Sequence, residues 1–587
     1  MKIKYFLAII ILVNLFLSIY GNSWGLPSRW HIDEKIINVL HMAQEKTLVD
    51  VGDSFYHPTA YQLVLAVFLA PYFLFLKLTG CPLAQIETLA SVSWIEMAKS
   101  FPDFAASIFI YARSISAIFG ALTVLIIFLT ARKLYDKKIA LFSAASLAVC
   151  MGFIETNHIA KQLSFFNFLI VLVLFLCVCA LVPDARRRRN MNLAFLFSGL
   201  AVSTQFNALL IFIPLFLMLW FNLSRNALSN PAENIIICRI KILFLSVLFF
   251  ILGLLLGTPS LVTNFKDYLR VFFRLLEFGL ANDASGMRLM PAIYSLFVGP
   301  ANYFFEILSI YGIFLFSFIL FGIVLVIKRW NKLKREEIVV FSFLTVYFFV
   351  MTVLLKDKYP QTKHIIAIVP LLSIFSGIAL NYLYEKIKIP HYLKHLIVAV
   401  VFAYSFFYAL EADKVFIRKD TRYASTEWIK KNIPKGAKIE LFNQLAYIGS
   451  DEIFSEYNIL YLGKDSLHDS GHNFFRWDQA PDKEKHLAYL NKNTSRAEYI
   501  IVSYDDYEEF TSPNYRAHIP GLSIFIKDLF SGKKGFRLVK TIQPKNKKIR
   551  LSKFPGIVIN ENLFWDPVPL YGSTAMTIQI FKKADDL

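Results

Sequence analysis

The sequence predicts a mainly α-helical protein that crosses a membrane about eleven times and ends in a small soluble α/β domain. Of its 587 residues, 56% are hydrophobic and only 18% are charged, whereas soluble domains carry about 25% charged residues. Apolar runs of roughly 17–25 residues, long enough to cross ~30 Å of hydrocarbon, recur between residues 5 and 411. Beyond about residue 412 the charges become dense and the apolar runs shorten.

The apolar runs define the expected spans. The first run follows Met1–Lys4 and also fits a cleaved signal peptide, but no small-x-small cleavage site follows Tyr20, which favours a retained helix. Either alternative places residue 21 on the outer side. We expect spans at 5–20, 108–130, 139–154, 164–182, 191–206, 207–223, 241–257, 303–327, 338–355, 364–383 and 395–411.

The short loops with the densest Lys and Arg clusters all fall on one side of this arrangement. The positive-inside rule assigns that side to the cytoplasm, so the N-terminus is expected inside and the C-terminal domain outside. The clusters are Arg132, Lys133, Lys137 and Lys138; Arg186 to Arg189; Arg225, Arg239 and Lys241; Lys328, Arg329, Lys332, Lys334 and Arg335; and Lys386, Lys388 and Lys394.

Residues 59–79 are apolar enough to span, yet a single crossing there would move every later basic loop to the outer side. We therefore expect a re-entrant or interfacial element on the outer side, because backbone at membrane depth is tolerated where protein covers it. The alternative is a true span paired with a second crossing within 80–107, which preserves the same sidedness.

The resulting domains are a membrane domain over 1–411, with a long first outer loop at 21–107, and an extracytoplasmic α/β domain over 412–587. Further outer segments are expected near 258–302 and 356–363. Within the C-terminal domain the hydrophobic pattern predicts an amphipathic helix at 423–433 and strands at 438–443, 498–503 and 575–581.

The net charge of +19 does not indicate nucleic-acid binding, because the charge is spread along the chain and much of it lies in short loops between spans. The five cysteines form no CxxC pair and no Cys/His cluster of metal-ligand spacing. We therefore predict no nucleic-acid partner and no defined metal site. The cofactor is left open: the only feature that favours a bound divalent cation is the acidic pair described next.

The first outer loop contains the acidic pair Asp33-Glu34. A solvated loop pair is one interpretation, and the other is a base at the membrane surface that acts on an acceptor hydroxyl or amine. Successive side chains of a helix point about 100° apart, so one carboxylate can face the substrate while the other orients it. His57, in Tyr56-His57-Pro58, either binds substrate or caps a turn.

Basic residues on the outer side run against the usual charge distribution and favour contact with an anionic lipid phosphate. Plain headgroup contact is the alternative, and for Arg113 a snorkelling anchor. These candidates are Arg113 at the start of a span; His158 and Lys161 in one short loop, with the acidic candidate Glu155 beside them; and Lys356, Lys358, Lys363 and His364 in another.

Taken in order, several short stretches resemble the GT-C membrane glycosyltransferases, in particular the protein O-mannosyltransferase and aminoarabinose-transferase branch. The resemblance covers about residues 5–385. The stretches are HIDE at 31–34, YHP at 56–58, RSISAIFGALTVLIIFLTARKLYDKKIAL at 113–141, NHIAK at 157–161, SGLAVSTQFNALL at 198–210, GTPSLV at 257–262 and KHIIAIVPLL at 363–372.

The resemblance implies a polyprenyl-phosphate sugar donor, an active site at the outer membrane surface, and Asp33 as the base with Glu34 beside it. Because phosphate leaves as a stable anion, it needs neutralisation by Lys or Arg more than it needs a general acid. One base can then suffice for an inverting displacement, unlike glycoside hydrolysis with its two carboxylates. Two departures from the family pattern concern the donor contacts: Gln162 to Ser164 bring no acidic residue after Lys161, and Gln205 replaces a lysine before Phe206-Asn207.

Two other functions remain as alternatives. A transporter or flippase for a lipid-linked saccharide would explain many spans, but it predicts ionisable residues deep in the helices and inverted repeats. A non-catalytic assembly protein would retain the scaffold, and the missing acidic position favours it. The identity of the sugar, hexosyl or pentosyl, and of the acceptor, whether protein, lipid or glycan, is left open by the sequence.

Overall fold

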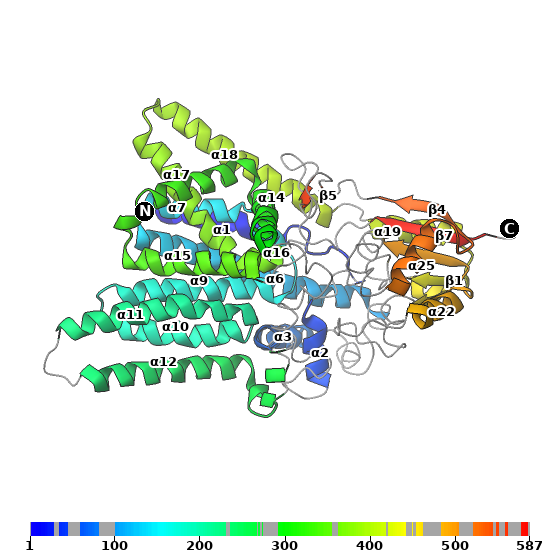
Figure 1. Ribbon diagram of the computed structural model, residues 1–587, viewed down its shortest axis with the longest axis horizontal. Helices are drawn as coiled ribbons and strands as arrows, with labels where there is room; N and C mark the ends of the chain where they lie inside the picture. Colours follow the sequence, from blue (N-terminus) through cyan, green and yellow to red (C-terminus); the bar gives the residue numbers. More distant parts are fainter. Residues whose placement is uncertain are drawn as a thin grey trace.

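The computed structural model describes residues 2–26, 28, 34–44, 59–80, 100–229, 235–266, 268–270, 273, 292–354, 362–417, 421–441, 449, 453–461, 483–503, 520–543, 548–550, 558–560 and 577–584. A helical bundle forms one end of the molecule and a small α/β domain forms the other (Figure 1). This arrangement confirms the predicted fold class.

Long apolar helices build the bundle, and each predicted span coincides with one of them or with a closely spaced pair. The helices are α1 (Lys2–Ile19), α6 (Pro102–Leu134), α7 (Lys137–Ala148), α8 (Met151–Asn157), α9 (Gln162–Leu181), α10 (Arg187–Val202), α11 (Phe212–Ser229), α12 (Ile235–Gly257), α14 (Ala292–Ile327), α15 (Arg335–Phe349), α17 (Val369–Lys386) and α18 (His391–Asp413). Short segments η1 (Phe206–Ile211), η5 (Val350–Leu354), α16 (Thr362–Ile365) and η6 (Ile366–Ile368) extend some of them.

Within the described residues, nine helices are long and apolar enough to cross a membrane, or ten if the bent pair α7 and α8 counts as one span. That pair turns by 61°, and the Asp136 side chain caps the start of α7 by accepting from the amides of Lys138 and Ile139. Helices α1 and α10 are shorter than this criterion, and α14 contains Gly312 at φ 69°, where the helix kinks. The predicted number of eleven spans is therefore approximate.

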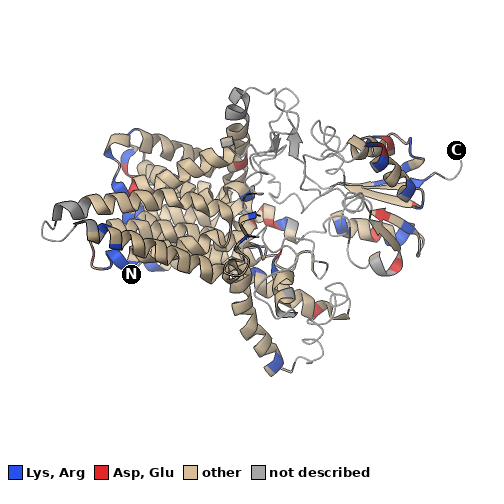
Figure 2. Cartoon of the chain, turned by 60° about the horizontal axis from the view of Figure 1, so that its bottom comes forward, with Lys and Arg blue, Asp and Glu red and all other residues tan. Residues whose placement is uncertain are grey.

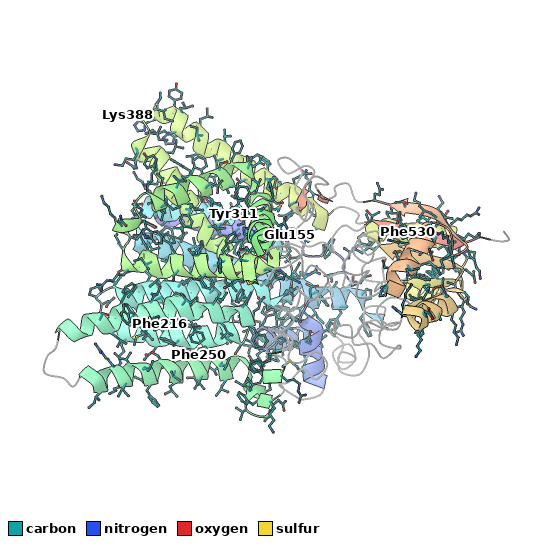
Figure 3. All side chains as sticks on the ribbon, in the orientation of Figure 1. Glu155, Phe216, Phe250, Tyr311, Lys388 and Phe530 are labelled. Carbon is teal, nitrogen blue, oxygen red and sulfur yellow. The ribbon has the colours of Figure 1, made fainter. Side chains whose placement is uncertain are left out.

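The basic loops lie together at the end of the bundle that carries the N-terminus. Figure 2 shows Lys and Arg gathered at this end. Figure 3 labels Lys388 there and Glu155 near the opposite end, which faces the C-terminal domain. The basic loops therefore share one end of the bundle. We name the other end, with Glu155, the outer end after its predicted side.

Helix α3 (Ala60–Leu78) crosses the bundle instead of running along it. It is seen end-on in Figure 1, where α9, α10 and α12 are seen from the side. Tyr61 hydrogen-bonds Ser116 at 2.7 Å, and Tyr72 stacks on Tyr111 at 4.3 Å. The two contacts are eleven residues apart on α3, about 16 Å of helix, but only five residues apart on α6, about 7.5 Å. Two helices that ran side by side would show equal separations. This geometry favours the expected interfacial element over a crossing, although α3 is apolar enough to span.

Two further contacts fix the start of α3 at the outer end. The Thr59 hydroxyl donates to the carbonyl of Gly257 at 2.9 Å, and the Ala60 amide donates to the carbonyl of Ser203 at 3.0 Å. Gly257 ends α12 and Ser203 follows α10. The side of α3 that faces away from the bundle exposes Val67, Leu74, Phe75 and Leu78.

The C-terminal domain contains a five-stranded sheet with strand order β2-β1-β3-β7-β4. Strand β1 pairs in parallel with β2 and β3, whereas β7 is antiparallel to β3 and β4. The strands are β1 (Lys438–Leu441), β2 (Asn458–Tyr461), β3 (Tyr499–Ser503), β4 (Phe536–Ile542) and β7 (Ile578–Lys583); β5 (Lys548–Arg550) and β6 (Val558–Asn560) form a separate pair.

Helix α19 (Thr421–Asn432) packs on one face of the sheet through Ile429 and Ile439. Helices α22 (Lys483–Thr494) and α25 (Pro520–Phe530) contribute Leu490 and Phe525 to a second core on the other face. Helix α19, β1, β3 and β7 confirm the predicted helix and strands.

Candidate functional site at the outer end of the bundle

A buried ion pair joins the first outer loop to α6. Arg113 donates from Nε to Glu34 Oε1 at 2.8 Å and from Nη2 to Glu34 Oε2 at 2.9 Å. Both residues are at most 1% exposed. Arg113 Nη1 also donates to the carbonyls of Asn22 and Trp24, at 2.6 and 2.8 Å. Four donor contacts of the guanidinium therefore serve the first outer loop, and such bidentate pairing fixes the carboxylate in direction as well as position.

Glu34 also connects this loop to the segment between α8 and α9. The amide of Ala160 donates to Glu34 Oε1 at 3.0 Å, and the amide of Lys35 donates to the carbonyl of Ala160 at 3.0 Å. Side chain and backbone together hold residues 34 and 35 against residue 160. Three distant parts of the chain, at 34, 113 and 160, thus meet at one carboxylate.

His158 forms a second buried bridge next to the first. Its Nδ1 lies 3.2 Å from Asn22 Oδ1, and its Nε2 lies 3.2 Å from Oδ1 of Asp413, the last residue of α18. The Phe416 ring packs on the imidazole with centroids 4.4 Å apart. His158 is 2% exposed and Asp413 is 1% exposed. His158 therefore binds protein groups through both ring nitrogens.

The remaining predicted residues of this region gather around the same outer end. Glu155 lies in α8 and is 1% exposed, and Lys161 caps α9 and is 5% exposed. Lys363 and His364 lie on α16, which packs against α14. The Tyr303 hydroxyl of α14 is 3.4 Å from His364 Nδ1. Segment η6, which follows α16, contacts α9 directly.

Several sequence-predicted residues fall outside the described part of the chain. Asp33 and His57 are among them, as are Lys356 and Lys358. Their predicted roles remain predictions. Of the nine candidate site residues, the structure brings Glu34 and Arg113 into direct contact and joins His158 to the same first outer loop through Asn22.

Sequence reasoning missed polar residues along α1 and the turn after it that support this region. Asn14 and Ser18 lie one turn apart on α1 and share a helix face, and Asn22 lies in the turn that follows; all three are at most 4% exposed. The Asn14 amide donates to the carbonyl of Ala148, and the Asn157 amide donates to Ser18 Oγ at 3.3 Å. A spacing of four between polar residues in an apolar span was the signal that could have revealed this face.

Asn157, just before His158, occupies a socket with little spare room. Ser164 Oγ donates to its Oδ1 at 2.8 Å. On α6, a Cβ added to Gly120 would lie 2.3 Å from Asn157 Nδ2. Only glycine therefore fits at position 120 without displacing the amide.

Side-chain contacts hold the two residues that follow Gln205. Asn207 Nδ2 donates to the Tyr347 hydroxyl at 2.7 Å, and Phe206 packs edge-on against Tyr268 at 5.3 Å.

Among the described residues, no group of three or more His, Cys, Asp and Glu side chains could hold a metal ion.

A recess of about 330 Å³ lies where the end of α1 meets the segment after α18. Its lining includes the four aromatic residues Tyr20, Trp24, Phe416 and Tyr423. Gly21, Ser23 and Ile417 complete the wall. The Arg422 guanidinium lies 5.0 Å from the Trp24 ring. The first outer loop and the start of the C-terminal domain are therefore in direct contact.

Comparisons with known proteins confirm the resemblance: the bundle and its α/β domain have the GT-C fold of membrane glycosyltransferases. The model of the family described as Dolichyl-phosphate-mannose-protein mannosyltransferase matches residues 106–252. The chain is thus similar to this family over α6 to most of α12. No curated protein matches the sequence.

Solved structures support the fold over nearly the whole chain. The archaeal oligosaccharyltransferase AglB from Archaeoglobus fulgidus, in complex with an inhibitory peptide and a dolichol-phosphate, is 14% identical. The alignment covers 97% of this chain and 77% of that chain with a TM-score of 0.51. The same oligosaccharyltransferase tethered to an acceptor peptide containing the NVT sequon is 12% identical over 97% and 77% of the two chains, with a TM-score of 0.52.

ArnT from Cupriavidus metallidurans, bound to undecaprenyl phosphate, is 14% identical over 87% of this chain and 94% of that chain, and its TM-score is 0.46. That score is too low to support an inference. Identities below 25% show the shared fold, and function requires separate support from the site.

Proposed function

We propose that this protein transfers a sugar from a polyprenyl-phosphate donor to an acceptor at the outer membrane surface, with Asp33 as the base of an inverting displacement. The acceptor hydroxyl or amine forms the new bond to the anomeric carbon and passes its proton to the Asp33 carboxylate. The bond between the anomeric carbon and the phosphate oxygen breaks, and the phosphate leaves with the electron pair.

The carrying observation is the fixation of Glu34. Two bonds from Arg113 and one from the Ala160 amide hold this carboxylate. Asp33 precedes Glu34 in the sequence, and we propose that the fixed Glu34 is the anchor for the base. A base needs such an anchor, because a misplacement of about 1 Å can cost on the order of 100-fold in rate.

The geometry changes the role that we assign to Arg113. The sequence favoured this residue as a phosphate ligand, but it is 1% exposed and directs four donor contacts at the first outer loop. We now propose that it positions Glu34. Neutralisation of the leaving phosphate then falls to Lys161, Lys363 and His364, since cationic groups aimed at developing charge stabilise a transition state.

The fold supports the donor class. The structure of AglB with a dolichol-phosphate shows that a protein of this fold binds a polyprenyl phosphate. The distribution of charge supports the proposed sidedness. The basic loops lie at the end of the bundle that carries the N-terminus, and the proposed site lies at the opposite end (Figure 2). The acceptor class, protein, lipid or glycan, stays open in this proposal.

The test is transfer of label from polyprenyl-phosphate sugars in membranes that contain the full chain. Wild type should transfer label to an endogenous acceptor, and Asp33→Asn should lose about 1,000-fold or more of this activity, in the range of removing a general base and its positioning. Asp184→Asn is the matched control, since Asp184 is exposed in a loop at the N-terminal end. Full activity of Asp33→Asn would remove Asp33 as the base.

The same membranes distinguish a flippase. If labelled lipid-linked saccharide changes leaflet in sealed vesicles while no label reaches an acceptor, transport replaces transfer as the function. If cysteine labelling places residue 33 on the cytoplasmic side, the proposed sidedness is wrong.

A further inference from the structure

We propose that His158 and Asp413 act as positioning residues: their buried bridge holds the first outer loop against residue 160, and so couples the end of α18 to the acidic pair. Where it concerns activity, this inference rests on the proposed function. It assigns to Asp413 a role that the sequence did not indicate and moves His158 from substrate contact to positioning.

The bridge uses both ring nitrogens of His158. Nδ1 is 3.2 Å from Asn22 Oδ1, and Nε2 is 3.2 Å from Asp413 Oδ1. The Asn22 amide oxygen can only accept, so Nδ1 donates to it in this arrangement, and one hydrogen lies between Nε2 and the Asp413 carboxyl group. If the Asn22 amide is turned over, a neutral ring with hydrogen on Nε2 makes the same two contacts. The bridge persists in both forms.

Asn22 connects this bridge to the Glu34–Arg113 pair. Its side chain meets His158, while its carbonyl accepts from Arg113 Nη1 at 2.6 Å. Ala160, two residues after His158, makes a second connection to the same ion pair, because its amide donates to Glu34 Oε1. A shift of His158 therefore moves both the loop that carries Asn22 and the amide that holds Glu34.

On the Asp413 side, the bridge reaches the segment that links α18 to the C-terminal domain. Asp413 ends α18, and Phe416, three residues later, packs on both the His158 ring and the Trp24 ring. Gly21, at φ 94°, permits this approach, since a Cβ there would lie 2.7 Å from Phe416 Cβ. The position of the C-terminal linker and that of the first outer loop are therefore set by the same contacts.

Hydrogen exchange on the purified full chain tests the positioning directly and requires no substrate. Asp413→Ala should raise exchange by about tenfold at the amides of Lys35 and Ala160, which bond across the junction. The amide of Ile139, capped by Asp136 at the N-terminal end, is the control and should not change. Asp413→Asn retains an acceptor for Nε2–H and should preserve protection at both amides.

The transfer assay gives the second readout. Asp413→Ala should lower transfer by on the order of 10- to 100-fold, and Asp413→Asn should restore it to within about threefold of wild type. The double variant His158→Ala with Asp413→Ala should lose no more than the worse single variant, because residues that act as a unit are not additive.

The outcomes separate the two proposals. Unchanged exchange at Lys35 and Ala160 in Asp413→Ala would overturn the positioning role, even if exchange rises in the linker after α18. Failure of Asp413→Asn to restore protection would also overturn it. If wild type transfers no sugar but the exchange results are as expected, the proposed function fails and the positioning inference stands.

Discussion

Two buried carboxylates, one in each part of the molecule, show how partners rather than burial decide what a charge does. Glu34 at the outer end of the bundle is 0% exposed, and Arg113 and a backbone amide bind its two oxygens. Glu440 on β1 of the C-terminal domain is 1% exposed, and its Oε2 has no hydrogen-bond partner among the described residues. A fixed, fully paired carboxylate can anchor a site, whereas a buried one without a cation and with one oxygen unpaired costs stability once it ionises.

The largest expected effect comes from breaking the paired carboxylate. Arg113→Met leaves Glu34 buried without its cation and should destabilise the protein by about 3–5 kcal/mol. Thermal unfolding of the purified chain in detergent measures this loss. The double variant Glu34→Leu with Arg113→Met removes both charges and should lose less than the single variant. If the double variant is less stable than Arg113→Met alone, Glu34 and Arg113 do not act as a coupled unit.

The incompletely paired carboxylate of Glu440 should make the C-terminal domain sensitive to pH. Burial raises the pKa of Glu440 from 4.5 to about 8, partly offset by a hydrogen bond with Thr494. Because the folded-state pKa is the higher one, stability is greatest below about pH 4.5 and falls as pH rises towards 8. The loss at pH 7 should be about 3 kcal/mol.

Glu440→Gln removes that dependence. Hydrogen exchange in β1, measured on the full chain at pH 5 and pH 8, should become faster with pH in wild type and much less so in the variant, after correction for intrinsic rates. Glu498→Gln, at an exposed position just before β3, should keep the wild-type profile. Equal pH profiles for wild type and Glu440→Gln would mean that Glu440 ionises without cost.

A smaller effect tests polar packing, as distinct from charge pairing, beneath the site. Gly120→Ala places a Cβ 2.3 Å from Asn157 Nδ2, and overpacking of this kind costs roughly 1–3 kcal/mol. Thermal unfolding measures the loss. Adding Asn157→Ala creates room, so the double variant should be more stable than the sum of the two single effects predicts. Strict additivity would show that the two positions do not share space.

The sequence was sufficient for the features that depend on local pattern. Span length, the basic loops and the acidic pair in the first outer loop follow from composition along the chain, and so does α19 of the C-terminal domain. Strand β4 escaped notice because its seven residues, FRLVKTI, mix basic and apolar side chains without a clear alternation.

The contacts that build the site could not be predicted in the same way. Glu34 and Arg113 are 79 positions apart, and His158 and Asp413 are 255 apart. No spacing rule relates residues on helices whose packing is decided by tertiary contacts. Asp413 lies just beyond the last predicted span, and only the fold shows that it faces His158.

The smallest expected effect completes the comparison with an ion pair that is not buried. Lys138 and Glu385 meet at 2.5 Å at the N-terminal end, but their side chains are 62% and 44% exposed. Water solvates both groups when the contact is broken, and such pairs contribute little to stability. Lys138→Ala should therefore leave the melting temperature unchanged within error, in the same assay in which Arg113→Met lowers it strongly. A comparable loss in both variants would mean that proximity of charges alone stabilises this protein, and that burial does not make the Glu34 pair special.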